Sequence, residues 1–280
     1  MIGKYLFTST VSVYGGLGHA KQCPTARTGP MPPHLLSAID MDLCCPMQEE
    51  DLDLLNVEDT YDPDLEVYAQ GKRQCEKYLL KQPDFNHVSI RVPPVLGPED
   101  PTRRIWYYIQ RVLDGKEMIL PDGGQNIFRN MFSVDVANAL IAAIDSEQTR
   151  PGAYNICQGE IMTLKQLIED IAEAVGKEPN LVSIPSEILE TQTDLPYESW
   201  RFDPFSRPGK YVMSIEKARR DFNMQWTPQR EWVKTTVEWY QTEYSGQDSV
   251  HYEQREKEAK IAGQYRKAFE GFMESLGGTF

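Results

Sequence analysis

The 280-residue chain carries 42 acidic and 29 basic side chains, which gives a formal net charge of −13, and 40 % of its residues are hydrophobic. A chain of this length and composition can bury one large core or two smaller ones. The acidic balance argues against nucleic acid or an anionic membrane as the main partner, although it leaves room for a local basic patch. No apolar stretch approaches the ~18–20 residues of a membrane span.

The cysteines and the N-terminus bear on the cellular compartment. The cysteines are odd in number and scattered: Cys23, Cys44, Cys45, Cys75 and Cys157. This usage is typical of reduced thiols in a cytosolic protein, and MIGKYLF is too short for a signal peptide. Cys44–Cys45 has no second pair at ligand spacing and the histidines are isolated, so zinc is the minor alternative. We therefore expect a cytoplasmic protein without a metal.

The chain begins with a predicted buried strand over residues 4–10. Residues 16–64 read as a proline-bearing loop insert that ends in the acidic run QEEDLDLLNVEDTYDPDLE. So long an irregular segment is unusual in a compact domain. Two interpretations stay open, a partly mobile lid over a site and a solvated insertion without function.

Further elements follow from hydrophobic spacing and from capping residues. Helices are predicted over residues 65–80, 103–114, 135–144 and 163–176, with a capping box from Thr163 to Gln166 in the last of these. Strands are predicted over 87–92, 118–120 and 154–157, and Ser214 and Thr227–Pro228 each open a helix. The alternation predicts an α/β fold with a mainly parallel sheet.

Three regions are expected along the chain. With the family resemblance described below, residues 1–160 would form a partial Rossmann-like domain that contains the 16–64 insert, residues 161–245 a small α/β substrate region and residues 246–280 a helical tail. The tail carries an apolar stripe at spacings of three and four, which predicts a packing face on the body of the protein or in a dimer: Ile261, Tyr265, Phe269, Phe272, Met273 and Leu276.

Three side chains form a candidate catalytic set. Tyr68 and Lys72 are four residues apart on a predicted helix and so share a face. A free phenol has a pKa of about 10, and a nearby ammonium favours the phenolate, which allows proton exchange with a hydroxyl or carbonyl oxygen. Thr10, in YLFTSTVSVYG, could hydrogen-bond the same oxygen, and Lys72 could hold a ribose hydroxyl. This set suits hydride transfer with a nicotinamide, although a Tyr–Lys pair alone is more often an ordinary helix-surface pair.

Several segments, taken in order, resemble one family. The chain over about residues 4–243 is similar to the extended short-chain dehydrogenase/reductases, the NAD-dependent epimerase/dehydratase family, in FTSTVSVYG, YAQGKRQCEKYL, SIRVPPVLGPED, FSVDVANALIAAI, GAYNICQGEIMTLKQLIEDIAEAVGK and SIEKARRDFNMQWTPQREWVKTTVEWY. The resemblance implies a Rossmann-type parallel sheet and NAD or NADP as cofactor. It also implies epimerase, dehydratase or reductase chemistry at a hydroxyl or carbonyl of a small, possibly sugar-like substrate.

The resemblance also implies roles for single residues. Thr10, Tyr68 and Lys72 would be catalytic. Cofactor contacts would come from Tyr68, Lys72, Pro93 and Val95, and substrate contacts from Thr10 and Arg129. Arg129 stands one position after the place of the family's substrate arginine. Glu76, Arg91 and Asn155 also match positions of the family pattern.

The chain also departs from the family pattern. The Gly-rich turn that binds the cofactor pyrophosphate does not precede the first strand, so the resemblance implies a partial Rossmann-like sheet without its N-terminal strands. We expect this chain alone to bind a dinucleotide weakly or not at all. We also expect the open edge of the strand over residues 4–10 to pair with another chain, as a homodimer or with a complementing N-terminal fragment. The alternative is a non-catalytic remnant or interaction protein that keeps the fold.

Overall fold

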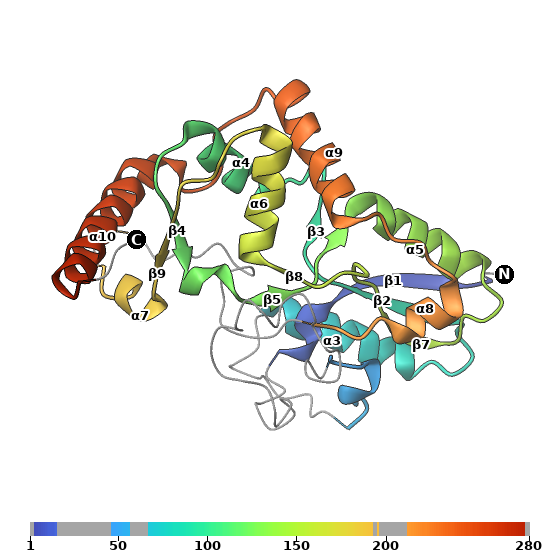
Figure 1. Ribbon diagram of the computed structural model, residues 1–280. Coiled ribbons are helices and arrows are strands. Elements are labelled where there is room, and N and C mark those ends of the chain that lie inside the picture. The colour runs from blue at the N-terminus through green and yellow to red at the C-terminus, as the bar shows by residue number, and fades with distance from the viewer. Residues whose placement is uncertain (1–2, 16–45, 57–66, 193–194, 196–211, 278–280) are drawn as a thin grey trace.

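The computed structural model describes residues 3–15, 46–56, 67–192, 195 and 212–277 (Figure 1). These residues form an α/β protein with a parallel sheet and a helical C-terminal segment, as the sequence predicts. Cys44, Cys45 and most of the predicted insert lie outside the described residues. In the described part, no helix is long and apolar enough to cross a membrane.

A three-stranded parallel sheet forms the first core. Its strands are β1 (Tyr5–Thr10), β2 (His87–Val92) and β7 (Gly152–Asn155), in the order β1-β2-β7. Every residue of β2 is buried, which is typical of a central parallel strand. The register places Thr10 opposite Val92 and Arg91 opposite Asn155, so the carboxyl ends of the strands lie together.

Helices cover both faces of this sheet (Figure 1). On one face α3 (Val67–Leu80) packs against β1 and against η1 (Val11–Tyr14). On the other face lie α5 (Ser133–Asp145) and α8 (Glu216–Phe222). The buried Ala139 and Ala143 of α5 let this helix approach the apolar side chains of β2 closely.

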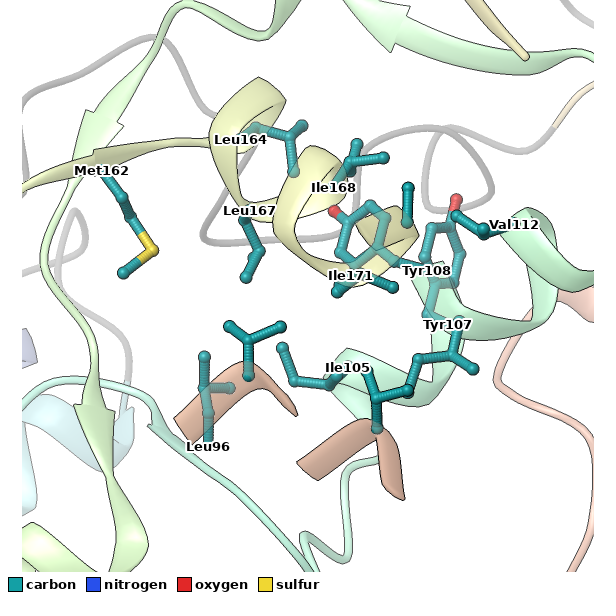
Figure 2. Packing of buried hydrophobic residues seen from close by; sticks show 14 of the residues in the cluster. Leu96, Ile105, Tyr107, Tyr108, Val112, Met162, Leu164, Leu167, Ile168 and Ile171 are labelled. Atoms are coloured by element: carbon teal, nitrogen blue, oxygen red, sulfur yellow. The ribbon is translucent and has the colours of Figure 1, made fainter. Parts of the chain in front are cut away.

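A second core lies around another pair of parallel strands, β4 (Met118–Pro121) and β9 (Leu181–Ile184). The helices α4 (Arg104–Asp114), α6 (Leu164–Val175) and α9 (Gln229–Thr242) pack together beside it. Figure 2 shows Ile105 and Tyr108 of α4 facing Leu167 and Ile171 of α6. The predicted capping box is present, because Thr163 Oγ1 accepts from the Gln166 N–H and Gln166 Oε1 accepts from the Thr163 N–H.

Short elements connect the two cores. Two small pairs join β3 (Val95–Leu96) to β6 (Met131–Phe132) and β5 (Ile127–Phe128) to β8 (Met162–Thr163). The remaining short helices are η3 (Glu49–Asp51), η4 (Asp122–Gly124), α7 (Ser186–Leu189) and η6 (Tyr252–Gln254). The elements α4 and β4 precede residue 160 in the chain, yet they pack with the second core. The domain boundary at residue 160 stays a prediction.

The tail forms α10 (Arg255–Ser275), which lies against β4 and β9 (Figure 1). Ile261 and Tyr265 pack on the cluster that contains Ile119 and Val182. Phe272 and Leu276, further along the same stripe, are 58 % and 66 % exposed. Within the described residues, the predicted packing face is therefore covered only over its first half.

Residues 46–56 are part of the packed structure. Met47 forms an isolated parallel bridge with Met213, and the Met47 N–H donates to Val212 O at 3.0 Å. Leu52 and Leu54 are buried in a cluster with Val13. This part of the predicted insert thus belongs to the core rather than to an exposed lid, and the rest of the insert lies outside the described residues.

Candidate active site

The candidate site lies where β1 and β2 end. In open parallel sheets, ligands bind outside the carboxyl ends of the strands. Thr10 is the last residue of β1 and is buried, and its Oγ1 accepts a hydrogen bond from the Ser12 N–H at 3.1 Å. The same hydroxyl donates to Ser12 Oγ at 3.2 Å. Locally, the hydroxyl-rich strand end therefore caps η1.

The structure brings Tyr68 and Lys72 together on the first turns of α3. The Lys72 Nζ atom lies 5.7 Å from the centroid of the Tyr68 ring and 4.9 Å from that of the Phe7 ring. It also donates a hydrogen bond to the Thr8 carbonyl oxygen at 2.7 Å. Tyr68 is 57 % exposed. The pair thus lies at the surface beside β1. The carbonyl that Lys72 binds belongs to Thr8, two residues before Thr10.

A buried carboxylate joins α3 to the sheet one helical turn after Lys72. Glu76 is 1 % exposed and accepts hydrogen bonds from Ser9 Oγ and from Arg91, whose Nη2 lies 2.8 Å from Glu76 Oε2. Burial alone would lower the pKa of Arg91, but its hydrogen bonds and charge interaction with Glu76 hold that pKa above its usual value. Lys72 and Glu76 therefore attach the same helix face to β1 at two successive turns.

Two further polar groups complete this network. Arg91 Nη1 donates to the Tyr14 hydroxyl at 2.7 Å, and that hydroxyl donates to Asn155 Oδ1 at 2.8 Å. Glu49 Oε1 accepts from the Asn155 N–H at 2.7 Å. Burial raises the pKa of Tyr14 and of Glu49, in spite of Arg91 beside Tyr14 and of the Asn155 hydrogen bond to Glu49. The network links the ends of β1, β2 and β7.

Tyr14 and Glu49 are not among the site residues that the sequence predicts. Glu49 stands in an acidic run that reads as solvated, yet it is buried against β7. The signal for Tyr14 was the Tyr–Gly pair that follows the hydroxyl cluster, which the family pattern uses only to place Thr10.

The other predicted site residues are Pro93, Val95 and Arg129, and no described contact joins them to the Tyr68–Lys72 pair. Pro93 is buried directly after β2, and Val95 is half-buried at the start of β3, so both lie near the strand ends. Arg129 is buried, and its guanidinium donates to the main-chain oxygens of Met213 and Gly159. No described contact brings Arg129 to Thr10 or Tyr68. Among the described residues, no group of three or more His, Cys, Asp or Glu side chains could hold a metal ion.

Part of the chain is similar in sequence to a known protein family. Residues 44–157 match the model of the NAD dependent epimerase/dehydratase family. The human dTDP-D-glucose 4,6-dehydratase is 22 % identical over 191 residues, which cover 65 % of this chain and 50 % of that protein.

Solved structures show the same fold. UDP-glucuronic acid 4-epimerase from Bacillus cereus, in complex with NAD, superimposes with a TM-score of 0.56 at 15 % identity, covering 87 % of this chain and 63 % of that one. dTDP-glucose 4,6-dehydratase from Bacillus anthracis, also with NAD, gives a TM-score of 0.54 at 20 % identity and covers 86 % and 62 %.

The chain spans about half the length of the curated relative and less than two thirds of each of these two structures. The matched residues include α3, β2 and all of β7, and these elements carry the Tyr68–Lys72 pair and the Glu76–Arg91 network. Over residues 44–157, the chain is similar to the NAD-dependent epimerase/dehydratase family.

Proposed function

We propose that this chain carries the catalytic groups of an NAD(P)-dependent epimerase, dehydratase or reductase that acts on a hydroxyl or carbonyl of a small, sugar-like substrate. The observation that carries this proposal is the Tyr68–Lys72 pair, held on β1 at the carboxyl edge of the parallel sheet. The names of the relatives support the substrate class, because they describe enzymes of UDP- and dTDP-linked sugars.

Each of the three side chains has a separate task in this proposal. The Tyr68 hydroxyl exchanges a proton with the substrate oxygen, since it is the exposed acid/base group of the set. The Lys72 ammonium stabilises negative charge on the Tyr68 oxygen. Thr10 orients the substrate oxygen by a hydrogen bond, for which its hydroxyl has to exchange its present partner, Ser12.

The residues present fit the nicotinamide end of a dinucleotide. Lys72 would hold a ribose hydroxyl, with Tyr68, Pro93 and Val95 beside it, because these residues lie at or near the ends of β1 and β2. The nicotinamide supplies the hydride acceptor when it is bound. Among the described residues, no Gly-rich turn leads from a strand into a helix to offer amides to phosphates, so this proposal assigns the phosphate contacts to another segment.

The same proposal places a strand–helix segment beside β1. In the described part of the chain, β1 lies at the edge of its sheet. On the adjoining helix α5, the apolar Val134, Ile141 and Ile144 are 52 %, 58 % and 56 % exposed. A helix that is apolar on all faces is usually buried, and a strand edge is usually paired or protected. A complementing strand–helix segment would cover both features.

The test is reconstitution. The chain is co-expressed with a Gly-rich strand–helix segment of the kind that the family pattern has ahead of the first strand. Conversion of a panel of UDP- and dTDP-sugars is then followed in the presence of NAD⁺ or NADP⁺. Turnover that depends on Tyr68 supports the proposal. A complex that binds NAD⁺ tightly yet converts no sugar, with Tyr68→Phe binding it equally well, would favour the non-catalytic alternative.

A further inference from the structure

The outer side of β1 offers main-chain groups that no described strand takes up. In a parallel ladder, alternate residues direct their N–H and C=O groups to the same neighbour. The Tyr5 N–H donates to Asn86 O at 2.9 Å, so Tyr5 and every second residue after it bond toward β2. Leu6, Thr8 and Thr10 therefore direct their main-chain groups to the opposite side, which no described strand covers and which is called the free edge below.

Lys72 binds one of these outward main-chain groups, the Thr8 carbonyl. Its Nζ atom donates to Thr8 O at 2.7 Å, and the Phe7 ring lies 4.9 Å from the same nitrogen. A hydrogen bond from an ammonium is roughly twice as strong as one between neutral groups. This contact takes up the carbonyl in the middle of the edge, where an added strand would place an N–H.

Lys72 is also the partner of Tyr68 in the function proposed above, and one ammonium has to serve both contacts. We propose that Lys72 guards the free edge of β1 by holding the Thr8 carbonyl, and that a strand pairing at this edge releases the ammonium toward Tyr68. The release half of this proposal rests on the proposed function. Lysine is a common protection of edge strands, and here it would couple completion of the sheet to readiness of the site.

A second copy of the chain is the occupant that the guard excludes. Every copy presents the same edge, so two copies can pair β1 with β1 about a twofold axis. The C-terminal end of α5, which carries the exposed Ile144, lies beside the start of β1, because Lys4, directly before β1, donates to Ala143 O at 2.8 Å and to Ile144 O at 3.0 Å. Such pairing would place the α5 helix of each copy beside the joined sheets.

The guard is tested by sedimentation equilibrium of the full chain. Lys72→Met keeps the length of the side chain and removes its charge, and it should tighten self-association about tenfold or more. Lys81→Met, an exposed lysine just beyond α3, makes the same charge change and should leave self-association unaltered. Adding Thr8→Pro to Lys72→Met removes an outward N–H without touching the β2 ladder, and it should reverse the gain. Equal association of the two lysine variants would overturn the guard.

Release is tested by closing the edge within one chain. A strand joined to Lys4 through a two-residue Asn-Gly turn forms a hairpin with β1, which amide-exchange protection at Thr8 verifies. Acylation of Lys72 by an amine reagent, followed by mass spectrometry, should then accelerate several-fold relative to Lys81. An unchanged ratio with the hairpin formed would refute release. Neither test uses turnover, so a chain that proves catalytically silent would leave both results standing.

Discussion

Glu76 is a carboxylate in the interior of the molecule, and its neighbours determine what it contributes. Arg91 binds both of its oxygens, at 3.2 Å through Nε to Oε1 and at 2.8 Å through Nη2 to Oε2. A buried ion pair adds little net stability over an apolar pair, but removal of one partner leaves the other charge buried and unpaired. The pair therefore matters more for fixing the position of α3 than for the overall stability of the fold.

We expect Glu76→Ala to lower the free energy of unfolding by about 3–5 kcal/mol, because Arg91 would lose its counter-charge in the core. Urea denaturation followed by circular dichroism measures this loss. Glu178→Ala, at an exposed loop position, is the matched control and should change stability by less than ~0.5 kcal/mol. A similar small effect for both variants would show that Arg91 finds another partner.

In a reconstituted enzyme, Tyr68→Phe should lower the turnover rate by ~10²–10⁴-fold, since it removes the group that exchanges the proton. Tyr78→Phe changes another exposed tyrosine of α3 and should leave the rate unaltered. Thr10→Val should cost less than Tyr68→Phe because Thr10 only orients, and Thr10→Ser should be nearly neutral. Full activity of Tyr68→Phe would mean that another residue is the acid/base group.

At the scale of elements, α10 is fastened to the second core by buried charges. Arg255 binds Asp114 through Nε at 2.8 Å and lies 3.3 Å from Glu258 Oε1, and Glu258 Oε2 accepts from Arg111 at 3.0 Å. Burial alone would raise the pKa of Asp114, but the Arg255 hydrogen bonds and the Lys116 N–H outweigh it and hold that pKa below its usual value. The attachment of the tail is therefore sensitive to acid.

A carboxylate whose pKa is lowered by folding stabilises the fold above its usual pKa of about 3.9 and loses that contribution as the pH falls through the lowered value. The difference in unfolding free energy between wild type and Asp114→Asn should thus be constant above about pH 5 and shrink toward about pH 3. Urea denaturation at several pH values checks this expectation. A difference that grows on acidification would contradict the assignment.

The start of α6 depends on a single hydroxyl. Thr163 is fully buried and caps the helix, with its Oγ1 accepting from the Gln166 N–H at 3.1 Å. Thr163→Ala should cost about 1 kcal/mol, within the ~0.5–2 kcal/mol range of lost N-caps, and Thr163→Ser should recover most of it. Thermal denaturation of the three proteins tests the cap. Equal losses for Ala and Ser would assign the cost to packing of the Thr163 methyl group.

The elements that could be predicted from sequence are those with regular spacing or with a capping residue. The helix after Thr163 and the buried strand HVSIRV are where the apolar pattern places them. The strands β3 and β5 have two residues each, which is too short for an alternating pattern to appear in the sequence. They form because they pair with β6 and β8, which lie further along the chain. Within the site, the spacing of Tyr68 and Lys72 can be recognised in the sequence. The burial of Arg129 and of Glu49 cannot, because Arg129 binds the distant Met213 and Glu49 binds the distant Asn155.

At the scale of the whole molecule, we expect the isolated chain to bind NAD⁺ and NADP⁺ weakly or not at all. The described residues offer contacts to the nicotinamide end but no helix start preceded by a Gly-rich turn for the phosphates. Isothermal titration calorimetry of the full chain with both dinucleotides measures this. A low-micromolar dissociation constant would show that residues outside the described part supply the phosphate contacts.

The bridge between Met47 and Met213 has a consequence for biosynthesis. At roughly 5–20 residues per second, ribosomes need on the order of ten seconds or more to reach Met213 after Met47. During that interval the residues of β2 are synthesised, while the apolar side chains that Met213 and Ile215 cover, among them Val13 and Leu54, are still exposed. The nascent chain therefore presents apolar surface for a long fraction of its synthesis, and its yield in cells should depend on chaperones that bind nascent chains.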